Sequence, residues 1–590
     1  MPHPLSCRRA LALVRHRLTL GVSAVVLALA GCAELPQNVD RPVSTALTAP
    51  AATPLGERVR ERRAAAGGRF ESGFMLLTGA PAAYGSRLAL VEGAQRTLDL
   101  QYYAIHADAS TGRLLRGVVD AARRGVRVRV LLDDFHSTGR NAMVMALASE
   151  PNIEMRMFNP LAGARGSSIG RMFNSIGDFS RVQQRMHNKL FIADNVMAVA
   201  GGRNLGDAYF GLAPKGNFID VDVLAAGPVV QGLSTSFDSY WNNERAYPVQ
   251  SLVSPDELKA LRDEAMAAEA SAGQGGGASS RSMPPDGEPR PAPEGPTDAQ
   301  RAMAWDNKAL DLRTATFVWA PAVVMADKPT KIALDASSAV SEDTAGSPGL
   351  VVTPSRDNTP GTPRTRSLDA ASDSAADGET VVDGLLQMIG TAQKDLLVIS
   401  PYFVPGADMK AAFAAARARG VRIRVLTNSL SSNDAPVAHV GYARHREELL
   451  GMGVELYELR SEQTGLRSAF GASGSGNVTG ESKAMLHSKV LVMDGRLLVV
   501  GSMNLDQRSQ LQNTEIALLI SSRELSGVAT QQIERALDIG AWHVELVDGS
   551  LVWRSPRDSG LQDQRTEPDT SASLRVLLKL FGPLAPDELL

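Results

Sequence analysis

Residues 186–204 read MHNKLFIADNVMAVAGGRN, and residues 486–504 read LHSKVLVMDGRLLVVGSMN. In both stretches a His is followed by a Lys two positions later, an Asp five positions after that and then a Gly-x-x-Asn, and aligned positions differ by 300 throughout. One such copy can arise by accident in a half-buried strand. Two copies in step indicate that the chain is duplicated and that its chemistry uses both.

Each copy is predicted to form a β-hairpin with a two-residue turn. Asp494-Gly495 is a strong turn signal between two apolar runs, and Asp194-Asn195 occupies the same place in the first copy. Because side chains alternate along a strand, the His, Lys and Asn of each copy then share one face, joined by Ser502 in the second copy. The two predicted clusters are His187, Lys189 and Asn204, and His487, Lys489 and Asn504.

The duplication extends upstream of both hairpins. In the first half, an apolar strand (LDLQYYAI, 98–105) is followed by a helical stretch and a second strand, and the helix end and second strand read AARRGVRVRVLLDD. The second half repeats this order with DLLVISPYFV (395–404) and AAFAAARARGVRIRVLTNS. Gly125 and Gly420 are predicted to terminate the two helices. The order strand, helix, strand is typical of βαβ units. The sequence therefore predicts an α/β protein of two duplicated domains, each a mixed, largely parallel sheet flanked by helices, with the active site at their interface.

Changes in composition set the predicted domain limits. We expect the first domain at 70–250, a linker at 251–378, the second domain at 379–545 and a tail at 546–590. Within the linker, two low-complexity stretches are rich in Gly, Pro and Ser and are predicted to be disordered, and the apolar run between them is expected to be a strand or a docking segment. These stretches are 269–299 and 326–378, with FVWAPAVVM at 317–325 between them.

The tail contains LRVLLKLF at 574–581, with Arg575 and Lys579 spaced four apart. This apolar stretch is expected either to lie on a membrane interface or to pack on the protein.

The N-terminus has the pattern of a secretory leader. Four Arg residues precede an apolar run at 18–30 that is too short to span a bilayer. The run ends in Leu-Ala-Gly-Cys, which resembles the lipobox of bacterial lipoproteins. We therefore predict a signal peptide at 1–31, a lipid on Cys32 and a linker at 32–69. The alternative is an ordinary signal peptide without lipidation. Only Cys7 and Cys32 are present, so cleavage leaves no pair for a disulfide and no thiolate zinc site.

Each predicted cluster has the composition of a phosphate site. Lys supplies a positive charge, Asn a hydrogen-bond donor, and His can attack phosphorus or transfer a proton. Displacement at a phosphodiester needs a nucleophile on one side of phosphorus and an acid on the other, in line. Two clusters face to face meet that need, with one imidazole forming a phosphohistidine and the other protonating the departing oxygen.

Four carboxylates accompany the clusters. Asp194 and Asp494 are favoured as turn formers, with a supporting role in the site as the alternative. Asp220 and Glu515, each opening the next strand, are better candidates to orient the imidazoles by accepting a ring N–H. His-x-Lys is not metal-ligand spacing, so neither a metal nor another cofactor is expected.

The duplicated motif resembles that of the phospholipase D superfamily. The stretches RGVRVRVLLDD, GGRNLGDAYFG and VGYARHREELLGMGVELYEL resemble, more narrowly, the bacterial cardiolipin synthases of the C type, over about residues 70–250 and 310–590. The resemblance implies a metal-independent phosphatidyl transfer in which His187 is the nucleophile and His487 the general acid. A phosphatidyl group would pass from one phospholipid to phosphatidylglycerol, giving cardiolipin. The long inserts depart from enterobacterial members and leave the membrane face open.

The resemblance also implies partners and a location. The expected substrates are phosphatidylglycerol and a second phospholipid, phosphatidylethanolamine being one candidate, and the expected site is the bacterial cell envelope, lipid-anchored and facing the periplasm. The need for a small accessory protein stays open. Tyr102, Tyr103, Tyr402 and residues 439–444 are expected to line a head-group pocket, although a solvated helix face is the favoured reading of His439 and His445.

Three other functions are alternatives to this one. A phospholipase D that hydrolyses lipids differs only in its acceptor, water, and is the main alternative. A nuclease is disfavoured by the formal net charge of -3 and the expected export, so no nucleic-acid partner is expected. A non-catalytic envelope protein is disfavoured because both clusters are intact.

Overall fold

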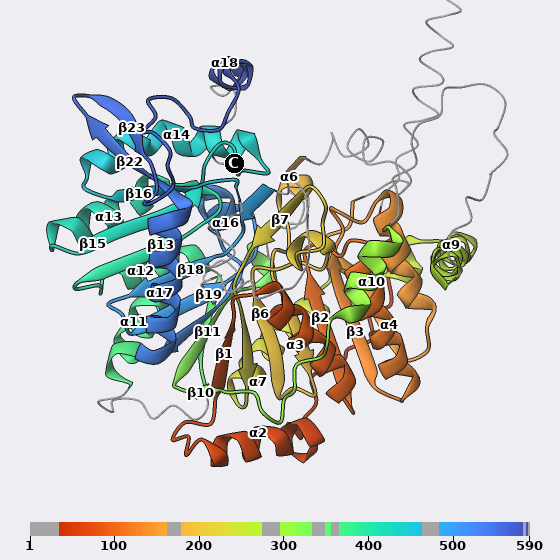
Figure 1. Cartoon of the computed structure of the whole chain (residues 1–590). Helices are drawn as coiled ribbons and strands as arrows, with labels where there is room; N and C mark the ends of the chain where they lie inside the picture. Colours follow the sequence, from red (N-terminus) through yellow and green to blue (C-terminus); the bar gives the residue numbers. More distant parts are fainter. Residues whose placement is uncertain are drawn as a thin grey trace, which may run out of the picture.

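The computed structural model describes residues 35–161, 179–273, 296–332, 349–355, 365–462, 483–581 and 586–587. Two large mixed sheets with flanking helices lie side by side, the first built mainly from the first half of the chain and the second from the second half (Figure 1). The predicted α/β fold of two similar halves is therefore confirmed.

The first sheet has nine strands in the order β10-β1-β8-β6-β5-β2-β3-β4-β9. They are β1 (Gly73–Leu77), β2 (Thr97–Tyr102), β3 (Arg127–Asp133), β4 (Ile153–Phe158), β5 (Leu190–Ala193), β6 (Met197–Gly201), β8 (Asp222–Ala226), β9 (Ala246–Pro248) and β10 (Val318–Trp319).

The second sheet has ten strands in the order β12-β11-β21-β19-β18-β13-β15-β16-β22-β23. They are β11 (Ala322–Asp327), β12 (Leu350–Pro354), β13 (Asp395–Ile399), β15 (Arg422–Asn428), β16 (Glu455–Leu459), β18 (Val490–Met493), β19 (Leu497–Gly501), β21 (Ile516–Ser521), β22 (Ala541–Val547) and β23 (Ser550–Arg554). Two small parallel pairs complete the strands, β14 (Phe403–Val404) with β20 (Leu505–Asp506) and β7 (Gly216–Ile219) with β17 (Lys483–Leu486).

The helices flank these sheets. They are α2 (Pro54–Ala65), α3 (Ala80–Gly93), α4 (Ala109–Arg123), α6 (Phe179–Gln183), α7 (Val229–Trp241), α8 (Val249–Leu252), α9 (Pro255–Gly273), α10 (Asp298–Asp306), α11 (Arg366–Ala376), α12 (Val381–Ile389), α13 (Ala407–Ala418), α14 (Pro436–Gly451), α16 (Gln507–Leu511), α17 (Arg523–Gly540) and α18 (Ala572–Phe581), with short 3₁₀ segments at Pro50–Ala52, Gly139–Ser149, Asp207–Tyr209 and Pro329–Lys331. Gly125 and Gly420 follow the ends of α4 and α13 in the left-handed conformation, as predicted.

The parallel part of each sheet is smaller than predicted. Only β2-β3-β4 and β13-β15-β16 run parallel, at the positions of the βαβ units, and the other pairings are antiparallel. The expectation of largely parallel sheets is therefore wrong. The physical reason is that hairpins give antiparallel neighbours, and the duplicated motif itself is a hairpin in each sheet.

The hairpin register also differs from the prediction by one residue. Met493 pairs with Leu497 and Ala193 with Met197, so three residues rather than two separate the paired positions. A two-residue turn at Asp494-Gly495 would place Val500 opposite Lys489, whereas Val500 pairs with Val490. Both faces of each hairpin are buried, so the alternation of apolar residues does not fix this register by itself.

Part of the predicted linker adds to the second sheet. The apolar run 317–325 contributes to β10 of the first sheet and β11 of the second, and β12 pairs with β11. Helix α11 buries Leu368 and Ala371 in the second core, so the prediction of disorder throughout 326–378 is wrong. Residues 274–295, 333–348 and 356–364 lie outside the described residues, and the domain limits stay predictions.

One apolar core joins the two halves. It contains residues of β5, β6 and β8 from the first sheet, residues of β18, β19 and β21 from the second, and the buried sides of α7 and α17. Because this core is continuous, the hairpins of the two halves are held in a fixed relation, and the residues that precede β5 and β18 meet across it.

Candidate active site

The two motif segments form backbone hydrogen bonds with the opposite half. The backbone N–H of His487 donates to the carbonyl of Ile219 at 2.8 Å, continuing the β17–β7 pairing, and the N–H of His187 donates to the carbonyl of Thr514 at 3.0 Å. Each imidazole is therefore carried by a backbone that the other half holds in place.

The side chains cross the interface in the same way. Nδ1 of His187 lies 3.0 Å from both carboxylate oxygens of Glu515, and Nδ1 of His487 lies 2.6 Å from Oδ2 of Asp220. Both carboxylates are buried. Acceptance of the Nδ1–H fixes the tautomer and leaves Nε2 for chemistry. The sequence singled out these two carboxylates, but only the structure shows which imidazole each one contacts.

Burial governs the electrostatics of the imidazoles. It lowers the pKa of His187 to about 4, against the opposing effect of Glu515, and it lowers the pKa of His487 well below the usual value, with Lys489 and Lys189 acting in the same direction. Burial also acts to raise the pKa of Glu515, but the His187 ring holds it at about 2. Both imidazoles are consequently neutral at neutral pH, and lysines of both halves act on one site.

The two lysines are buried beside their histidines. Lys189 donates to the carbonyl of His187 at 2.6 Å and Lys489 to that of His487 at 2.5 Å. Burial lowers the pKa of Lys189 to about 7 and that of Lys489 to about 8, while Glu515 and Asp220 act to raise them. Cations held this way, in surroundings of low polarity, attract an anion strongly.

The two halves differ beside the carboxylates. Ser502 donates to Glu515 at 2.5 Å. At the aligned position of the first half, Gly202 leaves room for Asp220, since a Cβ there would lie 2.5 Å from Oδ1. The motif asparagines are both buried, and Nδ2 of Asn204 donates to the Tyr209 hydroxyl at 2.9 Å.

Asp194 and Asp494 lie in the hairpin turns. The carboxylate of Asp194 accepts the N–H groups of residues 95–97, the shortest at 2.8 Å, and that of Asp494 accepts those of residues 393–395, the shortest at 2.7 Å. These bonds tie each turn to the chain that enters β2 or β13. The arrangement fits the favoured role of turn former.

Aromatic rings pack on both imidazoles. Tyr103 meets His187 edge-on at 5.1 Å between ring centroids, and Tyr209 and Phe218 lie 5.2 and 5.0 Å from His487. Sequence reasoning missed Tyr209 and Phe218, although Tyr209 lies in one of the stretches that carry the family resemblance. Tyr102 is buried against Arg87 and does not line this site.

The residues before the imidazoles are also held by side chains that the sequence did not single out. Asp133 accepts the N–H of Met186 at 2.9 Å, and Asn428 accepts the N–H of Leu486 at 2.8 Å. Asp133 and Asn428 each end the strand that follows the helix of the βαβ unit. A polar residue at the end of that strand is therefore the sequence feature by which both could have been predicted.

The expected pocket residues of the second half lie in different surroundings. Tyr402 donates to Asp434 at 2.7 Å. His439 is buried in an ion-paired cluster with Arg446 and Glu567, so the reading of His439 as part of a solvated helix face is wrong. Across the described ranges, no three His, Cys, Asp or Glu side chains gather in a way that suits a metal ion.

Comparison with known proteins gives consistent relatives. Residues 88–241 and 385–537 both match the family described as "Cardiolipin synthase, PLD-like domain". Cardiolipin synthase C of Escherichia coli (strain K12) is 32% identical over 526 residues, covering 86% of this chain and 94% of that protein. Cardiolipin synthase A of Pseudomonas entomophila (strain L48) is 23% identical over 468 residues, covering 78% and 68%.

A solved structure shares the fold. The crystal structure of phosphatidylserine synthase from Haemophilus influenzae Rd KW20 aligns with a TM-score of 0.50 at 12% identity, covering 90% of this chain and 99% of that one. Together, the two large sheets and the two matches to this family define an enzyme of the phospholipase D superfamily. More narrowly, the chain belongs to the cardiolipin synthase family with phospholipase D-like domains, and it is a phospholipid-modifying phosphatidyltransferase of that superfamily.

Proposed function

We propose that the chain makes cardiolipin by moving a phosphatidyl group from one phospholipid to a hydroxyl of phosphatidylglycerol. Nε2 of His187 attacks the donor phosphorus, and the bond from phosphorus to the head-group oxygen breaks as His487 gives that oxygen a proton. The phosphatidyl group is then held on His187. In the second step neutral His487 takes the proton of the phosphatidylglycerol hydroxyl, whose oxygen attacks phosphorus and displaces the imidazole.

The observation that supports this proposal most is the crossed pairing of His187 with Glu515 and His487 with Asp220. It gives each ring a fixed tautomer with Nε2 available, which suits one attacking and one proton-transferring imidazole. A phosphodiester anion bound beside the rings raises an imidazole pKa, so binding of substrate favours the protonated acid. Lys189 and Lys489 stabilise charge on the non-bridging oxygens.

We also propose that the enzyme works at a membrane surface. Val576 and Leu580 lie one helical turn apart on α18, and their side chains are 58% and 67% exposed. Before α18, Glu567 pairs with an arginine of α14, and after it Asp587 pairs with a histidine of α14, each at 2.9 Å. Apolar side chains held outward in this way suit a bilayer interface.

The proposed anchor is the lipid on Cys32, in the cell envelope and facing the periplasm. Residues 1–34 lie outside the described residues. Among the helices in the described part of the chain, none combines the length and apolar character that a bilayer crossing requires.

The test uses full-length protein with vesicles of phosphatidylglycerol, phosphatidylethanolamine or both, with products identified by mass spectrometry. Wild type is expected to form cardiolipin where phosphatidylglycerol is present, and His187→Ala and His487→Ala to form none. His543→Ala, which alters a histidine of β22 that lies beside Glu545, is the matched control and keeps activity. Phosphatidic acid as the sole product would assign hydrolysis instead, and no lipid product would refute both.

A further inference from the structure

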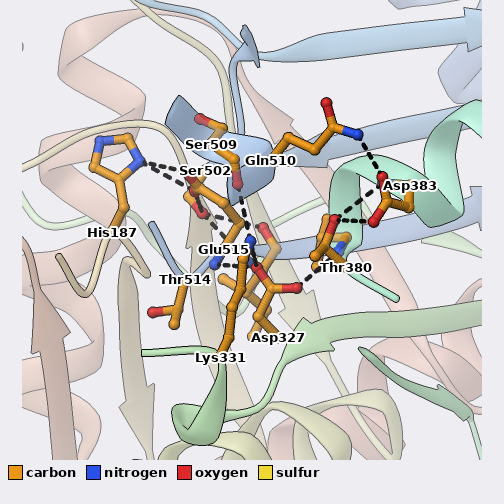
Figure 2. Close-up of polar contacts among 12 residues, drawn as sticks. His187, Asp327, Lys331, Thr380, Asp383, Ser502, Ser509, Gln510, Thr514 and Glu515 are labelled. Atoms are coloured by element: carbon orange, nitrogen blue, oxygen red, sulfur yellow. Dashed lines mark hydrogen bonds and ion pairs between the residues drawn. The ribbon is translucent and has the colours of Figure 1, made fainter. Parts of the chain in front are cut away.

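Glu515, the partner of His187, is itself held from behind by a second buried carboxylate (Figure 2). Oδ2 of Asp327, the last residue of β11, accepts the backbone N–H of Glu515 at 2.9 Å, and the N–H of Asp327 donates to the carbonyl of Glu515 at 3.0 Å. Oδ1 of Asp327 accepts the N–H of Val381 at 2.7 Å. Asp327 therefore fixes the backbone of Glu515 on both sides and ties it to the first residue of α12.

A cation accompanies this carboxylate. Nζ of Lys331 lies 2.8 Å from Oδ2 of Asp327 and 2.9 Å from the carbonyl of Ser509, and Oγ of Ser509 accepts the N–H of Asn504 at 3.2 Å. Burial raises the pKa of Asp327 to about 6, and Lys331 opposes the rise, so the carboxyl group of Asp327 is ionised at neutral pH. Lys331 thus links the support of Glu515 to the turn that carries Asn504.

The first half differs at the position equivalent to Asp327. Leu77 pairs with Asp222 at the place where Met325 pairs with Ala517, so Gly79 stands at the position of Asp327. Behind Asp220 the supporting group is instead the guanidinium of Arg203, which donates to the Asp220 carbonyl. The backbone of Glu515 is therefore held by a carboxylate, and that of the equivalent Asp220 by a guanidinium.

We propose that Asp327, paired with Lys331, is a positioning residue that holds Glu515 and through it the ring of His187. The inference rests on the proposed function, in which His187 reacts. A reacting group must stay within about 0.5 Å of its productive place. Loss of the negative charge of Asp327 leaves the buried Lys331 without its anion. It also weakens the hydrogen bonds that the Asp327 side chain accepts from Glu515, Val381 and Lys331, so Glu515 is no longer held in place.

The test is a double-mutant cycle in the full-length protein, read as the rate of donor phospholipid loss, which transfer and hydrolysis both produce. Asp327→Asn is expected to lower kcat about tenfold with KM unchanged, within the range of couplings in one hydrogen-bond network. In a Glu515→Gln background the same change is expected to alter the rate less than about twofold. In an Asp220→Asn background the full tenfold effect is expected, because Asp220 serves the other imidazole.

Asp383→Asn is the matched control. Asp383 lies in the same region and accepts Gln510 and Thr380, but it does not contact Glu515 (Figure 2). It is expected to keep the wild-type rate. The rates are compared at a temperature where circular dichroism shows that all variants are folded. If Asp327→Asn has the same effect in the Glu515→Gln and Asp220→Asn backgrounds, the positioning role is refuted while the proposed function stands. No donor loss by wild type would instead refute the proposed function.

Discussion

Asp220, in the first half of the chain, lies 2.6 Å from Nδ1 of His487 in the second half. Its counterpart Glu515 reaches back to His187, so neither half holds a complete site by itself. Because each half supplies one imidazole and the carboxylate of the other, loss of one carboxylate should disable only one of two chemical roles.

The phosphatidyl group is expected to reside on His187. With a donor whose leaving group is p-nitrophenolate, departure needs no proton, so His487→Ala is expected to release about one equivalent and then stall. His187→Ala is expected to show no burst. Stopped-flow absorbance measures the burst, and mass spectrometry of digested protein locates the adduct. An adduct on the peptide of His487 would reverse the assignment.

Gly202 is expected to tolerate no side chain. A Cβ at Gly202 displaces Asp220 from His487, so Gly202→Ala should lower kcat by about 10²-fold or more. Steady-state rates at saturating lipid measure the loss. Gly112→Ala, at a helix position where a Cβ meets nothing within 4 Å, is the control and keeps activity. Full activity of Gly202→Ala would show that the Asp220 contact is not needed.

The pH dependence should follow the buried lysines. Since burial lowers the pKa of Lys189 to about 7 and that of Lys489 to about 8, the free enzyme loses these charges as the pH rises through that range. The value of kcat/KM, which reports the free enzyme, is therefore expected to fall between about pH 7 and pH 9. A bound phosphodiester anion raises both pKa values, so kcat falls at higher pH. If kcat and kcat/KM fall over the same pH range, this prediction is wrong.

Asp194 is expected to contribute stability rather than chemistry. Asp194→Asn weakens charge-assisted bonds to three buried or half-buried N–H groups, and it should lower the free energy of unfolding by about 1–3 kcal/mol. Urea denaturation measures this change. The half-exposed Asp494 should give a smaller loss on the same substitution. A fall in kcat with unchanged stability would instead place Asp194 in the reaction.

Helix α18 is expected to bind membranes. Val576→Asp with Leu580→Asp should weaken sedimentation with phospholipid vesicles about tenfold or more, since two apolar side chains leave the interface. Activity on a short-chain, monomeric phospholipid should stay at the wild-type level. Val528→Asp on α17, where the side chain is 42% exposed, is the control. Equal loss in the control would mean that α18 is not the contact.

Much of the site followed from the sequence because its signals are local. Strand alternation is enough to place His487 and Lys489 on one face, and a carboxylate opening the next strand points to Glu515. The register was missed by one residue, because hairpins buried on both faces carry apolar residues at every position. The order and direction of the remaining strands were missed because they depend on which surfaces pack.

The sequence by itself determined the duplication, the α/β class and the chemical groups of each half, since these are properties of neighbouring residues. The tertiary structure decided that the halves exchange partners. His187 and Glu515 are 328 positions apart, and His487 and Asp220 are 267 apart, so no local pattern relates them. Their contacts exist because one apolar core fixes the two sheets against each other, and the same packing places Asp327 behind Glu515.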